Sequence, residues 1–436
     1  MKITVRRKSY RQVAAMARPE HRKPRRPMFL FRILIRLLAI PDLLSARFTY
    51  TAEGMDKVAG KPCLILMNHS SFIDLKIAYK IFFPRPLSIV CTSDGFVGKY
   101  LLMRLIGCIP TNKFVSDVKL IGDMQYALRE LGSSVLMYPE ASYSFDGTAT
   151  PLPRKLGVLL KKLRVPVVTV TTSGAFSREP LYNCLQKRSN VPVSAKVQCL
   201  LTPEEIAEMP VGEIDALLDR VFTFDGFAWQ QKNNIVIDSP TRADGLNRIL
   251  YRCAHCGAEG EMEGRGIFLK CRHCGKVWEL TPLGQLRALT GPTEFAHIPH
   301  WYEWERQEVR RELTEGTYRL DTEVDIGMMV NYKAIYMVGS GRLTHDENGF
   351  TLTGCDGQLH YTQPPLACYS LYADYYWYEL GDVICIGDND TLYYCFPKGG
   401  DVVAKTRQAT EELYKLKKRR PVRRMRGEAA AAAEES

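Results

Sequence analysis

The sequence contains no run of about eighteen consecutive apolar residues, the length that a helix needs to cross a bilayer. A transmembrane span is therefore not expected. The apolar segment 28–40 contains two arginines and is followed by no small-residue cleavage pattern, so a secretory signal is not expected either. Nine of the 13 cysteines show no pairing pattern, which is typical of reduced cytosolic proteins.

The length and composition indicate a protein of several domains. The chain has 436 residues, of which 46% are hydrophobic and 10% aromatic. A chain of this size exceeds the usual single-domain range, and its apolar content is sufficient for buried cores. We expect two or three domains.

Positive charge is concentrated at the two ends of the chain. Residues 1–36 hold twelve Lys or Arg and one acid, and residues 415–426 hold eight Lys or Arg and no acid. Because the whole chain carries +11, the rest of it carries −8. Basic ends on an acidic body are typical of a protein bound to an anionic membrane surface. The alternative is that these ends are solvated and bind nothing.

The segment 28–40 lies between Pro27 and Pro41 and is apolar except for Arg32 and Arg36. These arginines are four positions apart and share one side of a helix. The helix would be about 20 Å long, too short for the roughly 30 Å hydrocarbon core. We expect an amphipathic helix lying in the membrane interface, on a cytoplasmic protein peripheral to the inner face of the cell membrane. The alternative is a helix packed on its own domain.

Strand and helix patterns alternate between residues 61 and 240. Strands are expected over 63–68, 87–92, 134–138, 165–172 and 193–200, and helices over 71–82, 96–106, 117–131, 155–163 and 203–221. This alternation predicts a layered α/β domain with a largely parallel sheet, whose active residues gather at the strand ends.

The most informative motif is N-H-S-S-F-I-D at residues 68–74, directly after an expected strand. It places His69 and Asp74 five positions apart, so their side chains meet only if the backbone turns between them. In a strand-to-helix turn, Asp74 can orient His69, and the second ring nitrogen can act as a general base near neutral pH. The residues from Ser71 to Asp74 also fit a helix capping box, and this motif alone does not separate the two interpretations.

Two later blocks favour the catalytic interpretation. Residues 107–113, G-C-I-P-T-N-K, end in Lys113, and residues 138–144, Y-P-E-A-S-Y-S, follow the strand expected at 134–138. With the H-x4-D motif, their order and spacing resemble the glycerolipid acyltransferase family, typified by 1-acylglycerol-3-phosphate O-acyltransferases. The hydrophobic segment 165–170 stands where that family has its fourth block. The resemblance covers roughly residues 28–240.

This resemblance implies an O-acyltransferase without a catalytic metal. His69 would deprotonate the acceptor hydroxyl, and Asp74 would stabilise the imidazolium. The donor would be acyl-CoA, an acyl carrier protein thioester or an acyl phosphate. The acceptor would be a lysophospholipid, with 1-acylglycerol-3-phosphate giving phosphatidic acid. Asn68, Glu140 and Ser142 would line the substrate site, and backbone N–H groups after Asn68 are candidate oxyanion donors.

The chain departs from the family pattern in the third block. Ala141, Ser142 and Tyr143 stand where the family has Gly, Thr and Arg. The resemblance associates that Arg with the phosphate of the acceptor, a task for which a phenol is poorly suited. We therefore expect phosphate recognition from Lys113 or Arg154. The alternative is that the acceptor is a different lysolipid, or glycerol-3-phosphate.

Four cysteines form two C-x-x-C motifs separated by fourteen residues: Cys253, Cys256, Cys271 and Cys274. This spacing resembles a zinc ribbon with tetrahedral thiolate ligands. Four protein ligands leave no open position for water, so we expect the zinc to be structural.

Zinc ribbons often contact nucleic acid, which suggests an alternative class of function. A binding protein of this class would use its basic ends to contact a phosphate backbone. Residues 253–274, however, carry three acids and three basic residues, so no basic stripe is present and we do not expect nucleic acid as a partner. A second alternative is a non-catalytic lipid-binding protein.

The remainder of the chain is predicted to be rich in β-structure. A polar aromatic linker is expected at 297–313, followed by short strands at 351–353, 366–371, 383–386 and 392–396. From Asp401, apolar positions recur at helical spacing up to residue 416. This order of elements is similar to pleckstrin-homology or GRAM-like domains.

Five segments are therefore expected. Residues 1–60 form a basic N-terminal segment with the interfacial helix, and 61–240 the acyltransferase domain. Residues 246–285 form the zinc ribbon, 295–416 the β-rich domain with its C-terminal helix, and 417–436 a basic, disordered tail.

Overall fold

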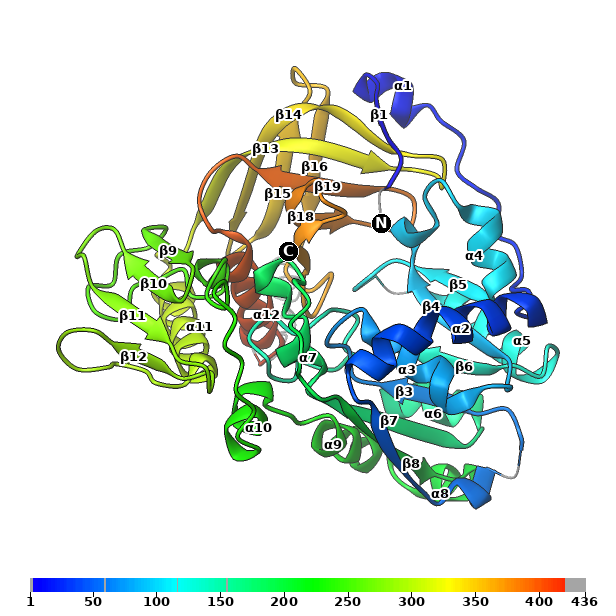
Figure 1. Cartoon of the computed structure of the whole chain (residues 1–436). Helices are drawn as coiled ribbons and strands as arrows, with labels where there is room; N and C mark the ends of the chain where they lie inside the picture. Colours follow the sequence, from blue (N-terminus) through cyan, green and yellow to red (C-terminus); the bar gives the residue numbers. More distant parts are fainter. Residues whose placement is uncertain (1–2, 59, 116, 154–155, 420–436) are drawn as a thin grey trace, which may run out of the picture.

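Three β-sheets organise the molecule (Figure 1). The computed structural model describes residues 3–58, 60–115, 117–153 and 156–419. A seven-stranded sheet with helices on both faces forms one side, a four-stranded sheet lies on the opposite side, and an eight-stranded sheet spans the top of the view in Figure 1. Within the described residues, none of the helices has the length and apolar character that a membrane crossing needs.

The seven-stranded sheet has the order β2-β8-β7-β3-β6-β4-β5. Its strands are β2 (Thr49–Glu53), β3 (Leu64–Met67), β4 (Leu87–Thr92), β5 (Cys108–Thr111), β6 (Ser134–Met137), β7 (Val167–Ser173) and β8 (Ser194–Leu201). Strands β3 to β7 are parallel, whereas β8 is antiparallel to β7 and carries β2 beside it. The predicted α/β domain is confirmed, and its edge strand β2 comes from within the expected N-terminal segment.

Helices cover both faces of this sheet, which is why its central strands are apolar throughout. One face carries α2 (Phe29–Ser45), α3 (Ile73–Phe82) and α4 (Tyr100–Ile106). The other carries α5 (Val118–Arg129), α6 (Leu156–Leu163), α8 (Pro203–Glu208) and α9 (Val211–Val221). The expected helix at 96–106 is shorter than predicted, because residues 93–96 form a 3₁₀ turn before α4 begins.

The α2 helix does not end before Pro41 as the sequence suggested. It continues to Ser45 with Pro41 inside it. A proline inside a helix costs about 3 kcal/mol. Ala39 and Leu43, on either side of the proline, are buried, and α2 packs against α3. This packing offsets the local cost, so the helix continues past Pro41.

The four-stranded sheet holds the cysteine motifs. Its antiparallel order is β12-β11-β10-β9, formed by β9 (Met262–Arg265), β10 (Phe268–Cys271), β11 (Val277–Leu280) and β12 (Leu286–Ala288). The expected linker at 297–313 is instead the helix α11 (Ile298–Glu315). Its buried side chains, including Trp301, Glu305 and Val309, recur at helical spacing.

The eight-stranded sheet confirms the prediction of antiparallel structure near the C-terminus. It contains β13 (Leu320–Met329), β14 (Ile335–Asp346), β15 (Gly349–Gly354), β16 (Leu359–Gln363), β17 (Tyr372–Trp377), β18 (Gly381–Gly387) and β19 (Leu392–Pro397), with β1 (Val5–Arg7) parallel to β14. The strand expected at 366–371 is wrong, because that segment is irregular and β17 begins at Tyr372.

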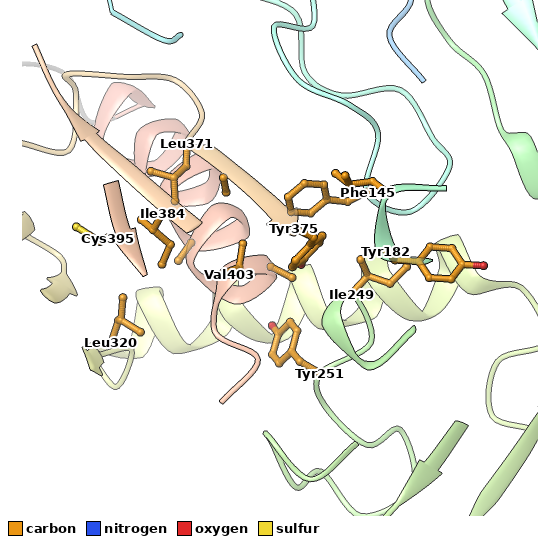
Figure 2. Packing of buried hydrophobic residues seen from close by; sticks show 14 of the residues in the cluster. Phe145, Tyr182, Ile249, Tyr251, Leu320, Leu371, Tyr375, Ile384, Cys395 and Val403 are labelled. Carbon is orange, nitrogen blue, oxygen red and sulfur yellow. The ribbon is translucent and has the colours of Figure 1, made fainter. Parts of the chain in front are cut away.

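The C-terminal helix α12 (Val403–Arg419) packs beside β17 and β18. The expected tail 417–436 begins inside this helix, and its residues 420–436 lie outside the described residues. One continuous core joins the cysteine-bearing sheet, the eight-stranded sheet and the loop after β6. Figure 2 shows Phe145 of that loop beside Tyr375 of β17, with Val403 of α12 and Tyr251 nearby.

Candidate active site

The loops after β3, β5 and β6 meet at one edge of the seven-stranded sheet. Because these strands are parallel neighbours, or separated only by β4, their carboxyl ends lie on the same edge. Asn68 fixes the first loop, since its Oδ1 accepts the Thr172 N–H at 2.7 Å and its Nδ2 donates to the Thr172 carbonyl at 3.2 Å. This amide clamp holds the start of the loop against β7. Asn68 therefore has a positioning role in this structure.

The backbone turns between His69 and Asp74 and brings their side chains together. Nδ1 of His69 lies 3.0 Å from Oδ2 of Asp74, whose side chain is completely buried. The same Oδ2 accepts the backbone N–H groups of Ser70 at 2.7 Å and Ser71 at 3.0 Å. Asp74 thus holds the turn before α3 and orients His69. Of the capping box, only the bond from the Ser71 N–H to Asp74 forms, because α3 has Phe72 as its N-cap without a side-chain cap.

Two tyrosine rings enclose the His69 ring. The centroids of Tyr138 and Tyr143 each lie 4.0 Å from that of His69, at interplanar angles of 25° and 31°. The His69 side chain keeps 19% of its surface exposed. Burial lowers the pKa of His69, and the Asp74 carboxylate opposes this shift. The ring is therefore neutral at physiological pH and, with Asp74 on Nδ1, presents Nε2 as a proton acceptor.

Glu140 binds the backbone rather than the ring of His69. Its Oε2 accepts the His69 N–H at 2.8 Å, and its Oε1 accepts the Thr150 N–H at 3.3 Å. Burial raises the pKa of Glu140 to about 8. The carboxyl group therefore couples the third sequence block to the turn that carries His69.

The loop after β6 contains a left-handed residue at the position where the family pattern has glycine. Ala141 has a φ of +54°, a conformation that glycine adopts freely and that costs other residues roughly 1–2 kcal/mol. Ala141 adopts this conformation although it carries a Cβ atom. Ser142 follows it, is buried, and donates to the Tyr143 carbonyl at 3.1 Å.

Of the two cations expected to recognise phosphate, the structure describes Lys113 but not Arg154. Lys113 follows β5, and its Nζ lies 4.1 Å from the centroid of the Tyr372 ring on β17. Its positive charge also adds to the lowering of the pKa of His69, behind the larger effect of burial. Arg154 lies outside the described residues.

A contact that the sequence did not indicate comes from α12. Nη1 of Arg407 donates to Oγ of Ser142 at 3.3 Å. Arg407 and Glu411 are four positions apart on the helix, a spacing that in sequence is typical of an exposed ion pair. In the structure both are buried.

The four cysteines of the small sheet also come together. Their Sγ atoms all lie within 4.8 Å of one another, with Cys253 and Cys274 at 3.8 Å and Cys256 and Cys271 at 3.8 Å. Tetrahedral thiolates at the usual zinc–sulfur distance of about 2.3 Å would be separated by about 3.8 Å. The donor set and its spacing therefore fit a zinc ion.

Comparisons with known proteins concern the domain that carries this site. Residues 49–173 match the family model named Acyltransferase. This segment forms an acyltransferase-like α/β domain. The match begins at the first residue of β2 and ends at the last residue of β7, so it includes His69, Asp74, Lys113 and Glu140.

Solved structures similar to part of the chain include the following one. It is the 1-acyl-sn-glycerophosphate (LPA) acyltransferase PlsC from Thermotoga maritima, with 15% sequence identity and a TM-score of 0.34, covering 44% of this chain and 76% of that one. No curated protein matches the sequence.

Proposed function

We propose that this protein transfers a fatty acyl group from an activated donor to the hydroxyl of a lysophospholipid. The proposed acceptor is 1-acylglycerol-3-phosphate and the product is phosphatidic acid. The observation that carries this proposal is the hydrogen bond of 3.0 Å between His69 and Asp74, inside a domain that matches the acyltransferase family. Neither catalytic position departs from the family motif.

The proposed reaction is a direct transfer. Nε2 of His69 takes the proton of the acceptor hydroxyl while its oxygen attacks the acyl carbonyl carbon. Asp74 stabilises the imidazolium through Nδ1. The tetrahedral intermediate then breaks its bond to the carrier, which leaves with the electron pair and receives the proton from His69. The carrier is coenzyme A or an acyl carrier protein for a thioester, and phosphate for an acyl phosphate.

A second acceptor class is favoured by Tyr143. Its ring stacks 4.0 Å from His69, where the family pattern has an arginine. A neutral aromatic ring beside the base suits a lysolipid whose head group is not a bare phosphate. We therefore keep a different lysolipid as the second candidate acceptor. Lys113, which lies within the described residues, supports 1-acylglycerol-3-phosphate as the acceptor.

We further propose that α2 holds the protein on an anionic membrane surface, at the inner face of the cell membrane. The helix exposes a line of apolar side chains: Met28, Phe29, Leu30, Leu34, Leu37, Leu38, Ile40 and Leu44. The preceding basic residues, Arg22, Lys23, Arg25 and Arg26, are exposed as well. An exposed apolar helix face next to exposed cations is the pattern that binds at a lipid interface.

We also propose that the four cysteines bind one structural zinc ion. The support is the distances between their Sγ atoms, and the ion would supply only a cross-link between the two motifs. For the C-terminal sheet and α12 we keep a pleckstrin-homology or GRAM-like plan as a proposal. Its support is a helix packed on an antiparallel sheet.

A panel assay tests the acceptor and the donor together. The purified chain is incubated with 1-acylglycerol-3-phosphate, other lysolipids and glycerol-3-phosphate, each with acyl-CoA, acyl carrier protein thioester or acyl phosphate. Products are identified by mass. Phosphatidic acid as the dominant product supports the first candidate, and acylation of another lysolipid in its place supports the second.

A further inference from the structure

The C-terminal helix reaches the loop that supports the catalytic base. Arg407 of α12 is only 3% exposed, and its Nη1 donates to Oγ of Ser142 at 3.3 Å. Its guanidinium also lies 4.3 Å from the centroid of the Phe145 ring. One side chain of α12 therefore holds two residues of the segment after β6.

The position of Arg407 is fixed from its own helix. Its Nε donates to Oε1 of Glu411 at 3.3 Å, and Glu411 also accepts from Arg306 at 2.6 Å and from Ser370 at 2.6 Å. Burial alone would raise the pKa of Glu411, but Arg306 and Arg407 hold it at about 2. The carboxylate is charged at neutral pH and anchors the guanidinium.

The segment held by Arg407 is the one that holds His69. Ser142 is two positions from Glu140, whose carboxyl group accepts the His69 N–H. Phe145 is also packed by Tyr375 of β17, with 4.7 Å between ring centroids (Figure 2). A cavity of about 680 Å³ borders the same segment and is lined by Thr148, Thr150 and Arg407, among others.

We propose that Arg407 is a positioning residue of the acyltransferase centre, acting through Ser142 and Glu140 on His69. This inference rests on the proposed function. The C-terminal helix is then a working part of the active site, although the acyltransferase family match ends at residue 173. A displacement of about 1 Å in a catalytic group can lower a rate by about a hundredfold.

The test compares kcat and KM in the full-length protein. Arg407→Met removes the hydrogen bond and the charge, and we expect kcat to fall by about ten- to a hundredfold while the acceptor KM changes little. Arg407→Lys keeps the charge and should restore part of kcat. Ser142→Ala removes the same hydrogen bond from the other side, with a small side chain that is tolerated in the fold.

Arg310→Met is the matched control. Arg310 binds Glu412 of α12 at 3.2 Å but is 41% exposed. Its loss removes one ion pair to α12 without touching the segment after β6, so activity should be close to that of the unmodified protein. Thermal unfolding of every variant shows whether the fold is retained.

The pH profile separates positioning from a purely structural role. Burial raises the pKa of Glu140, the negative charge of Asp74 adds to the shift, and the positive charge of Arg407 opposes it. If the ionised carboxyl group holds His69 best, the rate rises with pH as Glu140 ionises. Arg407→Met should move the midpoint of that rise to higher pH, and Arg407→Lys should not.

The outcomes separate this inference from the proposed function. Two results together support the positioning role. The combined Arg407→Met and Ser142→Ala variant is no slower than Arg407→Met alone, and the midpoint of its pH–rate profile lies at higher pH than that of the unmodified protein. If the unmodified protein and Arg407→Met are equally active, or if both substitutions slow the reaction independently, the positioning role is wrong and the proposed function stands. An unmodified protein that transfers no acyl group overturns both.

Discussion

At position 143, the side chain beside His69, the proposed base, is a ring rather than a cation. If this ring sets the acceptor preference, Tyr143→Arg should restore the phosphate contact that the family pattern implies. We expect the rate with 1-acylglycerol-3-phosphate to rise about tenfold relative to lysophosphatidylcholine, because one bidentate contact is worth at least about 1.4 kcal/mol. Competition between the two acceptors, with products measured by mass, checks this.

The control for that prediction is Tyr143→Phe, which keeps the ring against His69 and removes only the hydroxyl. It should leave the ratio of the two acceptors unchanged. If Tyr143→Arg and Tyr143→Phe have the same effect on both acceptors, residue 143 does not select the head group.

Glu140 should make stability depend on pH. Its pKa is about 8 in the folded protein and near 4.5 when exposed. Between these values the unfolded chain has released the proton that the folded chain keeps, so stability falls as pH rises, by at most about 1.4 kcal/mol per pH unit. Glu140→Gln removes the carboxyl group and with it this titration. Urea unfolding at pH 5 and pH 8 should show a larger loss for the unmodified protein than for Glu140→Gln, and parallel losses would contradict the shift.

Contacts between residues close together in the sequence could be predicted from it. Contacts between residues far apart in the sequence could not. His69 and Asp74 meet because the four residues between them form a turn, and the motif itself contains that information. Arg407 and Ser142 are 265 positions apart, and only the packing of the C-terminal sheet onto the catalytic edge brings them together. The stacking of Tyr143 on His69 likewise depends on the path of a loop with a left-handed residue.

At the scale of elements, the α2 helix is the feature proposed to bind the membrane. Leu34, Leu37 and Leu38 are 46%, 56% and 65% exposed, so they contribute little to folding. Each leucine that enters lipid contributes about 2 kcal/mol. We expect Leu34→Glu with Leu38→Glu to abolish cosedimentation with vesicles that contain anionic lipid, while the unfolding temperature is unchanged.

A matched control for this helix is Val236→Glu, at a residue that is 62% exposed in a loop outside α2. It adds one negative charge outside α2, half of what the double variant adds, and should bind vesicles as the unmodified protein does. Equal binding by all three proteins would exclude α2 as the membrane contact. Binding by the unmodified protein should also weaken with salt, because the basic residues before α2 act electrostatically.

Element types were predicted well where one periodic pattern dominated, and boundaries less well. The strands and helices of the α/β domain follow the expected order because apolar runs and glycines mark them directly. The end of α2 expected at Pro41 is wrong, because tertiary packing outweighs the local cost of a proline inside the helix. The sequence does not reveal the helix α11, because its many charged and aromatic residues obscure the helical spacing of the buried Trp301, Glu305 and Val309.

At the scale of the whole molecule, the cysteine cluster belongs to a core that reaches the catalytic loop. Cys253 and Cys271 share a buried cluster with Phe145 and with the C-terminal sheet. If zinc is bound, the purified protein should contain one zinc per chain. Chelation should lower the unfolding temperature and also slow acyl transfer, although no cysteine of the cluster is placed at the catalytic edge.

The control for the zinc prediction is Cys368→Ser, at a cysteine outside the cluster. It should retain the metal, whereas Cys271→Ser should lose it. A protein that contains no zinc, or one whose stability does not respond to chelation, would refute the structural metal.

The most direct test of the central claim is acyl transfer by the purified full-length protein and by its His69→Ala variant, with 1-acylglycerol-3-phosphate and each donor class. We predict that the unmodified protein forms phosphatidic acid, and that His69→Ala keeps its unfolding temperature but loses at least about a thousandfold in rate. Product formation by His69→Ala at the unmodified rate would contradict the assignment of His69 as the base.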